Sequence, residues 1–323
     1  MYSSEELLEK VNKYVARMTF DREPRSLYDP MKYVLSLGGK RVRPVLMLMA
    51  YNLFRDDVDT ILSPALALET YHNVTLLHDD LMDNSDLRRG FPTVHKKWNA
   101  NTAILSGDAM MVYAFKMMDT NQTNVADVMA TFVEAALEVN EGQQYDMSFE
   151  TRDDVTEDEY IEMIRLKTSA LLACALKMGG LLANAPKSDV MNLYCFGEKT
   201  GFAFQLMDDY LDVYGDPRIF RKQLGGDIVS NKKTFMLINA LNRADAKQRA
   251  ELDHWISAKD FDRNEKIAAV TRIYDEIGIR EISEEKVSKY YAESQKYLDA
   301  IAVEDEKKEG LRAYAERLIN RQF

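Results

Sequence analysis

Two short stretches of the sequence carry the same spacing of aspartates. Residues 76–83 read LLHDDLMD and residues 205–212 read QLMDDYLD, so a DDxxD pattern follows an apolar run twice. The carboxylates are those of Asp79, Asp80, Asp83, Asp208, Asp209 and Asp212. Aspartate is a poor helix former and is rarely buried without a partner, so the repetition requires a chemical reason.

The spacing of these carboxylates predicts a site for a hard metal ion. Residues four apart share one face of a helix, so Asp79 lies over Asp83, as Asp208 does over Asp212. The middle aspartate of each pattern is turned about 100° away. Two carboxylates ~4 Å apart repel by ~4 kcal/mol at an effective dielectric of ~20. Oxygen ligands suit Mg²⁺ before Ca²⁺, and Mg²⁺ held by few carboxylates keeps positions for phosphate. We therefore expect both motifs to bind a metal-bound diphosphate. The alternative is that the two motifs are unrelated aspartate-rich helix ends exposed to solvent. A single DDxxD pattern would be explained in this way more readily than two copies.

Basic residues lie beside both acidic motifs. GGKRVRP occupies residues 38–44, DLRRG follows the first aspartates at 86–90, and two lysines flank the Gly-Gly-Asp of 225–227. Forked guanidinium groups suit diphosphate oxygens. His72, seven residues before Asp79, is on much the same helix face and could donate to a phosphate. These cations indicate a second anion bound without metal, although helix capping and solubility are alternatives.

The composition of the chain indicates its general class. The 323 residues are 46% hydrophobic and 29% charged, with a net charge of −11, which is typical of a soluble globular protein and argues against nucleic acid as a partner. Cys174 and Cys195 lack metal-ligand spacing and indicate a reducing, cytoplasmic compartment. The N-terminus is acidic and amphipathic, unlike a signal peptide. The apolar stretch 169–185 contains Lys177 and two glycines, so we expect a core helix and no stable membrane insertion.

Helical periodicity recurs along the chain and predicts the elements that must position these groups. Ser3 with Glu6, and Thr156 with Glu159, have the spacing of capping boxes at helix starts. Convincing alternating strands are absent from the sequence. We expect a single all-α domain over residues 1–323, built from ten or more helices.

The ordered set of motifs resembles that of the trans-prenyl diphosphate synthase family, which elongates isoprenoid chains head to tail. The resemblance covers roughly residues 35 to 240 and rests on the order of GGKRVRP, HDDLMDNSDLRRGFPTVH, LSGD, EGQQYD, KTSAL, GFAFQLMDDYLDVYGD and GGDIVSNKKT. It implies a helical bundle around a central cavity, a homodimer, Mg²⁺ as cofactor with three ions per active site, and isopentenyl diphosphate and an allylic diphosphate as substrates.

The resemblance also implies roles for individual residues. The metal ligands would be Asp79, Asp83, Asp208 and Asp212, the last supporting through water. The catalytic group would comprise Lys167, Thr168, Gln205, Asp80 and Asp209, of which the aspartates support the metal site indirectly. Isopentenyl diphosphate would be held by Lys40, Arg43, His72 and Arg89. The allylic diphosphate would be held by Arg88, Lys167, Lys222 and Lys232, with Gln143 near the reacting carbons.

Product length would be set along the helix that precedes Asp79. The fourth and fifth residues before it are Thr75 and Val74, which are small, and Tyr71 is a candidate floor two turns below. Met111 could add to that floor, although ordinary core packing explains a methionine equally well. We expect a C15–C20 product or a somewhat longer one.

Three rival interpretations remain open at this stage. A terpene cyclase also uses a DDxxD pattern, but typically lacks the second copy and the GGKRxRP segment. A metal-dependent phosphohydrolase would need His72 and His78 as metal ligands. A non-catalytic subunit of a heteromeric synthase commonly loses aspartates that are intact here.

Overall fold

The computed structural model describes residues 1–118, 124–216 and 224–320, and almost all of its regular structure is helical. The longer helices are α1 (Ser4–Arg17), α2 (Arg25–Ser36), α3 (Val42–Asn52), α4 (Leu62–Met82), α6 (Ala100–Met117), α7 (Val125–Phe149), α8 (Glu157–Ile164), α9 (Ala170–Leu182), α10 (Lys187–Tyr214), α13 (Phe235–Arg243), α14 (Ala246–Ser257), α15 (Arg263–Ile277), α16 (Ile279–Asp299) and α17 (Asp305–Ile319). Shorter elements are the 3₁₀ helix η1 (Val58–Ile61), α5 (Val94–Lys97), the π-helix η2 (Arg165–Ser169), α12 (Gly226–Ser230) and the strands β1 (Leu87–Arg88) and β2 (Phe91–Pro92).

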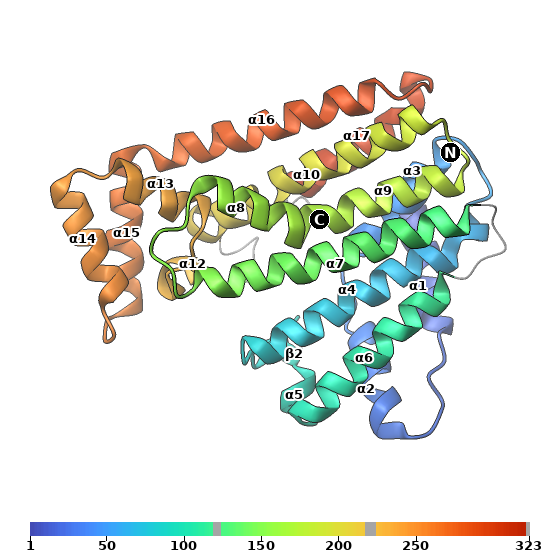
Figure 1. The fold of residues 1–323 in the computed structure, drawn as a ribbon, viewed down its shortest axis with the longest axis horizontal. Coiled ribbons are helices and arrows are strands. Elements are labelled where there is room, and N and C mark those ends of the chain that lie inside the picture. Colours follow the sequence, from blue (N-terminus) through green and yellow to red (C-terminus); the bar gives the residue numbers. More distant parts are fainter. Residues whose placement is uncertain (119–123, 217–223, 321–323) are drawn as a thin grey trace.

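The longest helices run side by side along the length of the molecule. Figure 1 shows α4, α7, α9, α10 and α16 lying in this direction, whereas α14 and α15 stand across one end. The two short strands form an antiparallel hairpin in which Leu87 pairs with Pro92. The prediction of an all-α fold is therefore confirmed.

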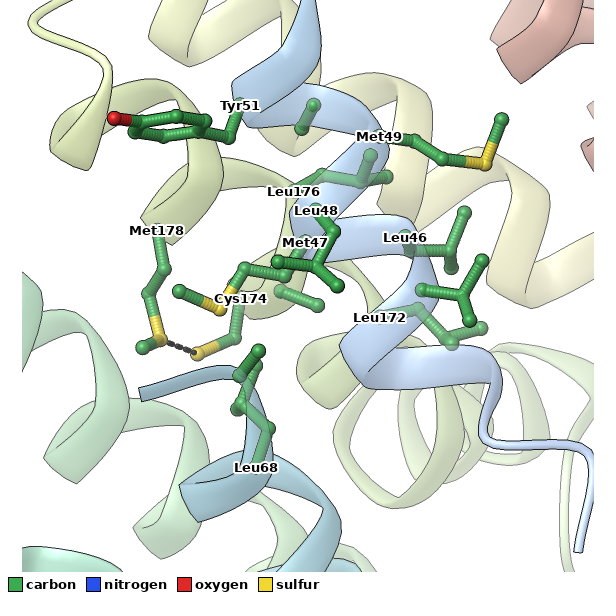
Figure 2. Packing of buried hydrophobic residues seen from close by; sticks show 14 of the residues in the cluster. Leu46, Met47, Leu48, Met49, Tyr51, Leu68, Leu172, Cys174, Leu176 and Met178 are labelled. Carbon is green, nitrogen blue, oxygen red and sulfur yellow. Dashed lines mark hydrogen bonds between the residues drawn. The ribbon is translucent and has the colours of Figure 1, made fainter. Parts of the chain in front are cut away.

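Helices α3 and α9 form the centre of the core. Nearly every residue of both helices is buried, as expected for helices that are apolar on all sides. Figure 2 shows Met47 and Leu48 of α3 packed beside Cys174 and Leu176 of α9. The two backbones approach closely at Gly179, where an added Cβ would lie 2.4 Å from the Met47 carbonyl oxygen. The predicted core helix over 169–185 is thus confirmed, and no described helix has the length and apolarity needed to cross a membrane.

Local sequence signals account for several helix starts. Both predicted capping boxes are present. The side chain of Ser3 accepts from the Glu6 amide, and that of Thr156 accepts from the Glu159 amide. In each box the glutamate carboxylate accepts in turn from the backbone amide of the cap residue. These reciprocal bonds satisfy amides that the first turn leaves without partners. The Thr156 box begins α8, which leads directly into η2, and η2 carries two of the predicted catalytic residues.

The two DDxxD motifs lie near the C-terminal ends of two long helices. Asp83 caps α4, and its amide donates to the Asp79 carbonyl at 2.8 Å. Asp212 lies in the last turn of α10. Helix C-termini carry partial negative charge, so carboxylates there increase the attraction for a cation.

Candidate active site

A cavity of ≈ 210 Å³ opens beside the first aspartate motif and continues along α4. Its lining includes ten of the residues that the sequence singled out: Arg43, Tyr71, His72, Val74, Thr75, Asp79, Met111, Gln143, Lys167 and Thr168. Polar and charged groups lie with Asp79, and Tyr71, Val74 and Met111 provide an apolar wall. One hollow therefore joins the candidate chemical groups to the candidate length-determining groups.

Asp79 is a carboxylate in an environment that disfavours its charge. Burial raises its pKa to about 6, the Lys167 ammonium opposes that shift, and the neighbouring Asp83 adds to it. A further cation beside Asp79 would stabilise the ionised carboxylate.

Asp80 forms an ion pair with Arg88 and is not among the residues that line the cavity. It is buried and accepts from Arg88 Nε at 3.0 Å and from Nη2 at 2.6 Å. This is the orientation expected for the middle aspartate of the pattern. The same contacts occupy two of the donors of Arg88, which the resemblance assigns to the allylic diphosphate.

The second motif is linked to η2 by a chain of hydrogen bonds. Thr168 Oγ1 donates to Gln205 Oε1 at 2.9 Å, and Gln205 Nε2 donates to Asp209 Oδ1 at 2.9 Å. Asp209 is buried and also accepts from the Tyr160 hydroxyl at 2.5 Å. Burial raises the pKa of Asp209 to about 6, against the effect of Lys232. The structure thus places Thr168 and Gln205 in contact, and adds Tyr160, which carries no motif signal in the sequence.

Lys232 enters a group of carboxylates around the second motif. Burial lowers the pKa of its ammonium, but Asp209, Asp227, Asp146 and Asp208 together hold that pKa above its usual range. Lys222, the other lysine assigned to the allylic diphosphate, lies outside the described residues.

Asp212 contacts the segment that carries Lys232. Its Oδ2 accepts from the Asp227 amide at 2.9 Å, and its carbonyl accepts from the Gly225 amide. Burial raises the pKa of Asp227 to about 7, against the effect of Lys232. The end of α10 and the start of α12 are therefore held together through one aspartate.

One ion pair lies within the electrostatic reach of both motifs. Lys167 Nζ donates to Asp146 Oδ2 at 2.5 Å. Lys167 lowers and Asp146 raises the pKa of Asp79, and Asp146 also raises the pKa of Lys232. Sequence reasoning did not select Asp146, although it ends the EGQQYD segment on α7. The pair connects the surroundings of α4 to those of α10.

A glycine allows α7 to pack closely against the segment that carries Lys167. A Cβ on Gly142 would lie 2.3 Å from the Lys167 amide nitrogen, so only glycine allows α7 this close to the π-helix η2. Single π turns within α-helices are frequently found at functional sites. Here the π turn carries Lys167 and Thr168.

The two basic motifs, far apart in the sequence, meet in the fold. Arg89 Nη1 donates to the Gly38 carbonyl, and a Cβ on Gly39 would lie 2.7 Å from the Arg89 guanidinium. Gly39 has φ +133°, which side chains disfavour. The glycine turn therefore brings Lys40, which is exposed, to the same end of the molecule as Arg89.

His72 lies among guanidinium groups rather than among carboxylates. Burial together with Arg43, Arg89 and Arg88 holds its pKa well below the usual value of 6.5, so the imidazole is neutral. Burial also lowers the pKa of Arg43 to about 10, and Arg43 Nε has no hydrogen-bond partner among the described residues. Such a group of cations fits an anion. It does not fit the histidine–aspartate metal set that the phosphohydrolase interpretation requires.

Arg41 is excluded from this anion site by its own contacts. It is buried and donates to Glu69 Oε1 at 2.6 Å and to the Leu35 carbonyl at 2.7 Å. Asn73 supports the pair by donating to Glu69 Oε1 at 3.1 Å. Unlike Lys40 and Arg43 of the same GGKRVRP segment, Arg41 is not assigned to a substrate, and its contacts stabilise the start of α3.

Comparisons with known proteins identify the family to which the chain belongs. The family model described as Polyprenyl synthetase matches residues 24–275. A short chain isoprenyl diphosphate synthase of Methanothermobacter thermautotrophicus is 33% identical over 97% of this chain and 96% of its own. A geranylgeranyl diphosphate synthase of Methanosarcina mazei is 36% identical over 86% of this chain and 85% of its own. A solved geranylgeranyl pyrophosphate synthase superposes with a TM-score of 0.94 at 38% identity, covering 99% of both chains. The chain therefore belongs to the polyprenyl synthetase family, which confirms the prediction made from the order of its motifs.

Proposed function

We propose that this protein is a prenyltransferase that adds isopentenyl diphosphate to an allylic prenyl diphosphate and releases a short all-trans product. The observation that carries the proposal is the single cavity lined both by charged and polar groups, among them Asp79, Lys167 and His72, and by apolar groups, among them Val74, Met111 and the ring of Tyr71. A diphosphate requires the charged part, and a growing hydrocarbon chain requires the apolar part.

The residues present fit Mg²⁺ as the cofactor. All candidate ligands are carboxylate oxygens, and desolvation raises the pKa values of the half-buried Asp79 and the buried Asp209, which a nearby cation would lower. Among the described residues, no three acidic, histidine or cysteine side chains gather closely enough to hold a metal by themselves. Mg²⁺ commonly shares its coordination between one or two carboxylates and substrate phosphates. Asp79, Asp83 and Asp208 would hold the ions, three per site by family resemblance, with Asp80, Asp209 and Asp212 orienting the surroundings.

The chain's own cations stabilise the charge that develops in the reaction. Mg²⁺, when bound, supplies Lewis-acid stabilisation of the leaving diphosphate. Lys167 and Lys232 offset the same negative charge as the allylic C–O bond breaks toward a carbocation. Arg43, Arg89 and the neutral His72 hold isopentenyl diphosphate so that its double bond faces that carbon.

The new bond and the departing proton complete the reaction. The π electrons of isopentenyl diphosphate form the C–C bond, and a proton then leaves the adjacent carbon for an oxygen of the released diphosphate. The oxygens of Thr168 and Gln205, held together by their hydrogen bond, present dipoles to the developing positive charge. Gln143 lines the same cavity. No side-chain nucleophile is required.

Product length is proposed to be limited at Tyr71. Its hydroxyl donates to the Ala136 carbonyl at 2.9 Å, and its ring meets Phe132 edge to face with centroids 5.4 Å apart. These contacts fix the ring across the apolar wall. Thr75 and Val74 are small and leave the space above it open, which supports a product of C15–C20 or somewhat longer.

We further propose that the protein acts as a homodimer. Large apolar side chains on α6 and α7 are exposed, with spacings of seven and four residues that place each set on one helix face: Leu105, Val112, Val133 and Leu137. A second copy would cover them. Sedimentation velocity should then give about twice the monomer mass. The cysteines, both unpaired, support a reducing compartment such as the cytoplasm.

The proposed function is tested by one reaction with matched controls. The protein is incubated with isopentenyl diphosphate and either geranyl or farnesyl diphosphate, and the products are identified by mass spectrometry. We expect elongation with Mg²⁺ and none with EDTA, and a large loss of rate for Asp79→Asn but not for the exposed Asp59→Asn. Elongation that persists in EDTA, or no elongation by folded protein with Mg²⁺, would contradict the proposal.

A further inference from the structure

Lys266 is a buried cation that the proposed mechanism does not use. It lies on α15 and is 1% exposed. Its ammonium donates to the Val229 carbonyl at 3.3 Å and to Asn231 Oδ1 at 2.7 Å, and lies 4.3 Å from the centroid of the Phe261 ring. Burial lowers the pKa of this amine, and no acidic group among the described residues counters that effect. Burying an ammonium group without a carboxylate partner costs free energy, so the packing around Lys266 must compensate for that cost.

The groups that Lys266 binds end the short helix α12. Asn231 terminates this helix in the left-handed conformation, with φ 54°. Its side chain is held at both ends, because Oδ1 accepts from Lys266 while Nδ2 donates to the Ile256 carbonyl at 3.0 Å. Asparagine tolerates the left-handed conformation better than most residues, and the two hydrogen bonds of its side chain hold Asn231 in this position. Lys266 therefore helps to fix the direction in which the chain leaves α12.

The next residue in that direction is Lys232. The opposite end of α12 is fixed by Asp212, whose Oδ2 accepts from the Asp227 amide at 2.9 Å. The Lys232 amide in turn donates to the Asp227 carbonyl at 2.9 Å. The segment is thus held by an aspartate of the second motif at its start and by Lys266 at its end. The Lys232 ammonium lies in the electrostatic field of carboxylates from α7, α10 and α12.

We propose that Lys266 is a positioning residue that directs Lys232 toward the allylic diphosphate. The inference rests on the proposed function, which places Lys232 at that diphosphate. A compact ammonium suits the task, because it binds both a side-chain amide and a carbonyl of the last helical turn, where positive charge is favoured. Arg43 and His72 belong to a different part of the structure, so loss of the Lys266 contacts should weaken the allylic site and leave the isopentenyl diphosphate site intact.

Replacement of Lys266 by methionine tests the inference, because methionine has a similar length and no donor. We expect Lys266→Met to raise the KM for geranyl diphosphate about tenfold, equivalent to ~1.4 kcal/mol, with the KM for isopentenyl diphosphate and the product length unchanged. Asn231→Gly retains the left-handed backbone and removes the acceptor, so it should raise the same KM by a similar factor. The double variant should be no worse than either single variant.

Lys308 supplies a matched control. It is also almost fully buried, on α17, where it donates to the Asp299 carbonyl at 2.9 Å and pairs with Asp305 at 3.1 Å. Lys308→Met should lower the melting temperature and change neither KM.

The outcomes separate the two proposals. If Lys266→Met leaves the KM for geranyl diphosphate unchanged, or raises both KM values equally, the positioning role is refuted. If Lys266→Met does not fold, Asn231→Gly alone decides the matter by the same criterion. An inactive wild-type protein would instead contradict the proposed function.

Discussion

Replacing Tyr71 by alanine should lengthen the product. Tyr71 lies eight residues before Asp79 on α4, about 12 Å along the axis at ~1.5 Å per residue, and its ring is 1% exposed. Removal of the ring opens the cavity toward Phe132, whose centroid lies 5.4 Å away. A chain that stops at Tyr71 in the wild type would then extend until it reaches Phe132, so the product distribution should shift by at least one C5 unit.

The cost of this change can be estimated from the contacts that Tyr71 loses. Truncating a fully buried aromatic side chain costs ~3–5 kcal/mol, of which the edge-to-face contact with Phe132 supplies ~0.5–1.5 kcal/mol. The hydroxyl bond to the Ala136 carbonyl contributes ~1 kcal/mol. Because domains are stable by ~5–15 kcal/mol, the variant should fold, and assays well below its melting temperature are appropriate.

The assay is product analysis by mass spectrometry with farnesyl and isopentenyl diphosphates. Tyr71→Phe keeps the ring and loses only the hydroxyl bond, so its product should match the wild type. Phe132→Ala alone should also leave the product unchanged, because Tyr71 still blocks the path, whereas the double alanine variant should give longer chains than Tyr71→Ala. A folded and active Tyr71→Ala protein with the wild-type distribution would refute the reasoning.

Three further results are expected. Glu69→Ala should lower the free energy of unfolding by ~3–5 kcal/mol, measured by urea denaturation, because it leaves the buried Arg41 guanidinium without its carboxylate; a change below ~1 kcal/mol would show that the pair is not structural. Gly142→Ala should lower kcat with little change in helical content, because the added Cβ would meet the Lys167 amide nitrogen and displace η2; an unchanged kcat would contradict that role of the close approach. The folded-state pKa of His72 is lowered, so the unfolded chain takes up this proton first and the free energy of unfolding falls as the pH drops below ~6.5. Between pH 7 and pH 5 the free energy of unfolding, measured by urea denaturation, should fall less for His72→Gln than for the wild type. An equal fall in both proteins would contradict the lowered pKa of His72.

Sequence patterns were sufficient where the signal is local. The two capping boxes depend on residues three apart, and the structure forms both. The four-residue spacing of Asp79 and Asp83 set them on one face, and Asp80 turns away to Arg88 as that geometry requires. The apolar stretch 169–185 correctly indicated the buried helix α9.

The remaining features depend on contacts between helices that no local pattern encodes. Tyr160 reaches Asp209 from α8, and Phe132 backs Tyr71 from α7, yet neither residue belongs to a motif. Arg41 has the same residue type and neighbourhood as Arg43, and only the tertiary position of a glutamate on α4 removes it from the anion site. The contact between Gly142 of α7 and the π turn at η2 likewise joins residues far apart in the sequence, and no local pattern indicates it.

The proposed catalysis requires that both aspartate motifs bind a single diphosphate through shared magnesium ions. A crystal structure with Mg²⁺ and an unreactive thiolo analogue of the allylic diphosphate would test it directly. We expect Mg²⁺ ions that bridge the diphosphate to Asp79 and Asp83 on one side and to Asp208 on the other. Ions bound to one motif alone, or a diphosphate that contacts neither, would contradict it.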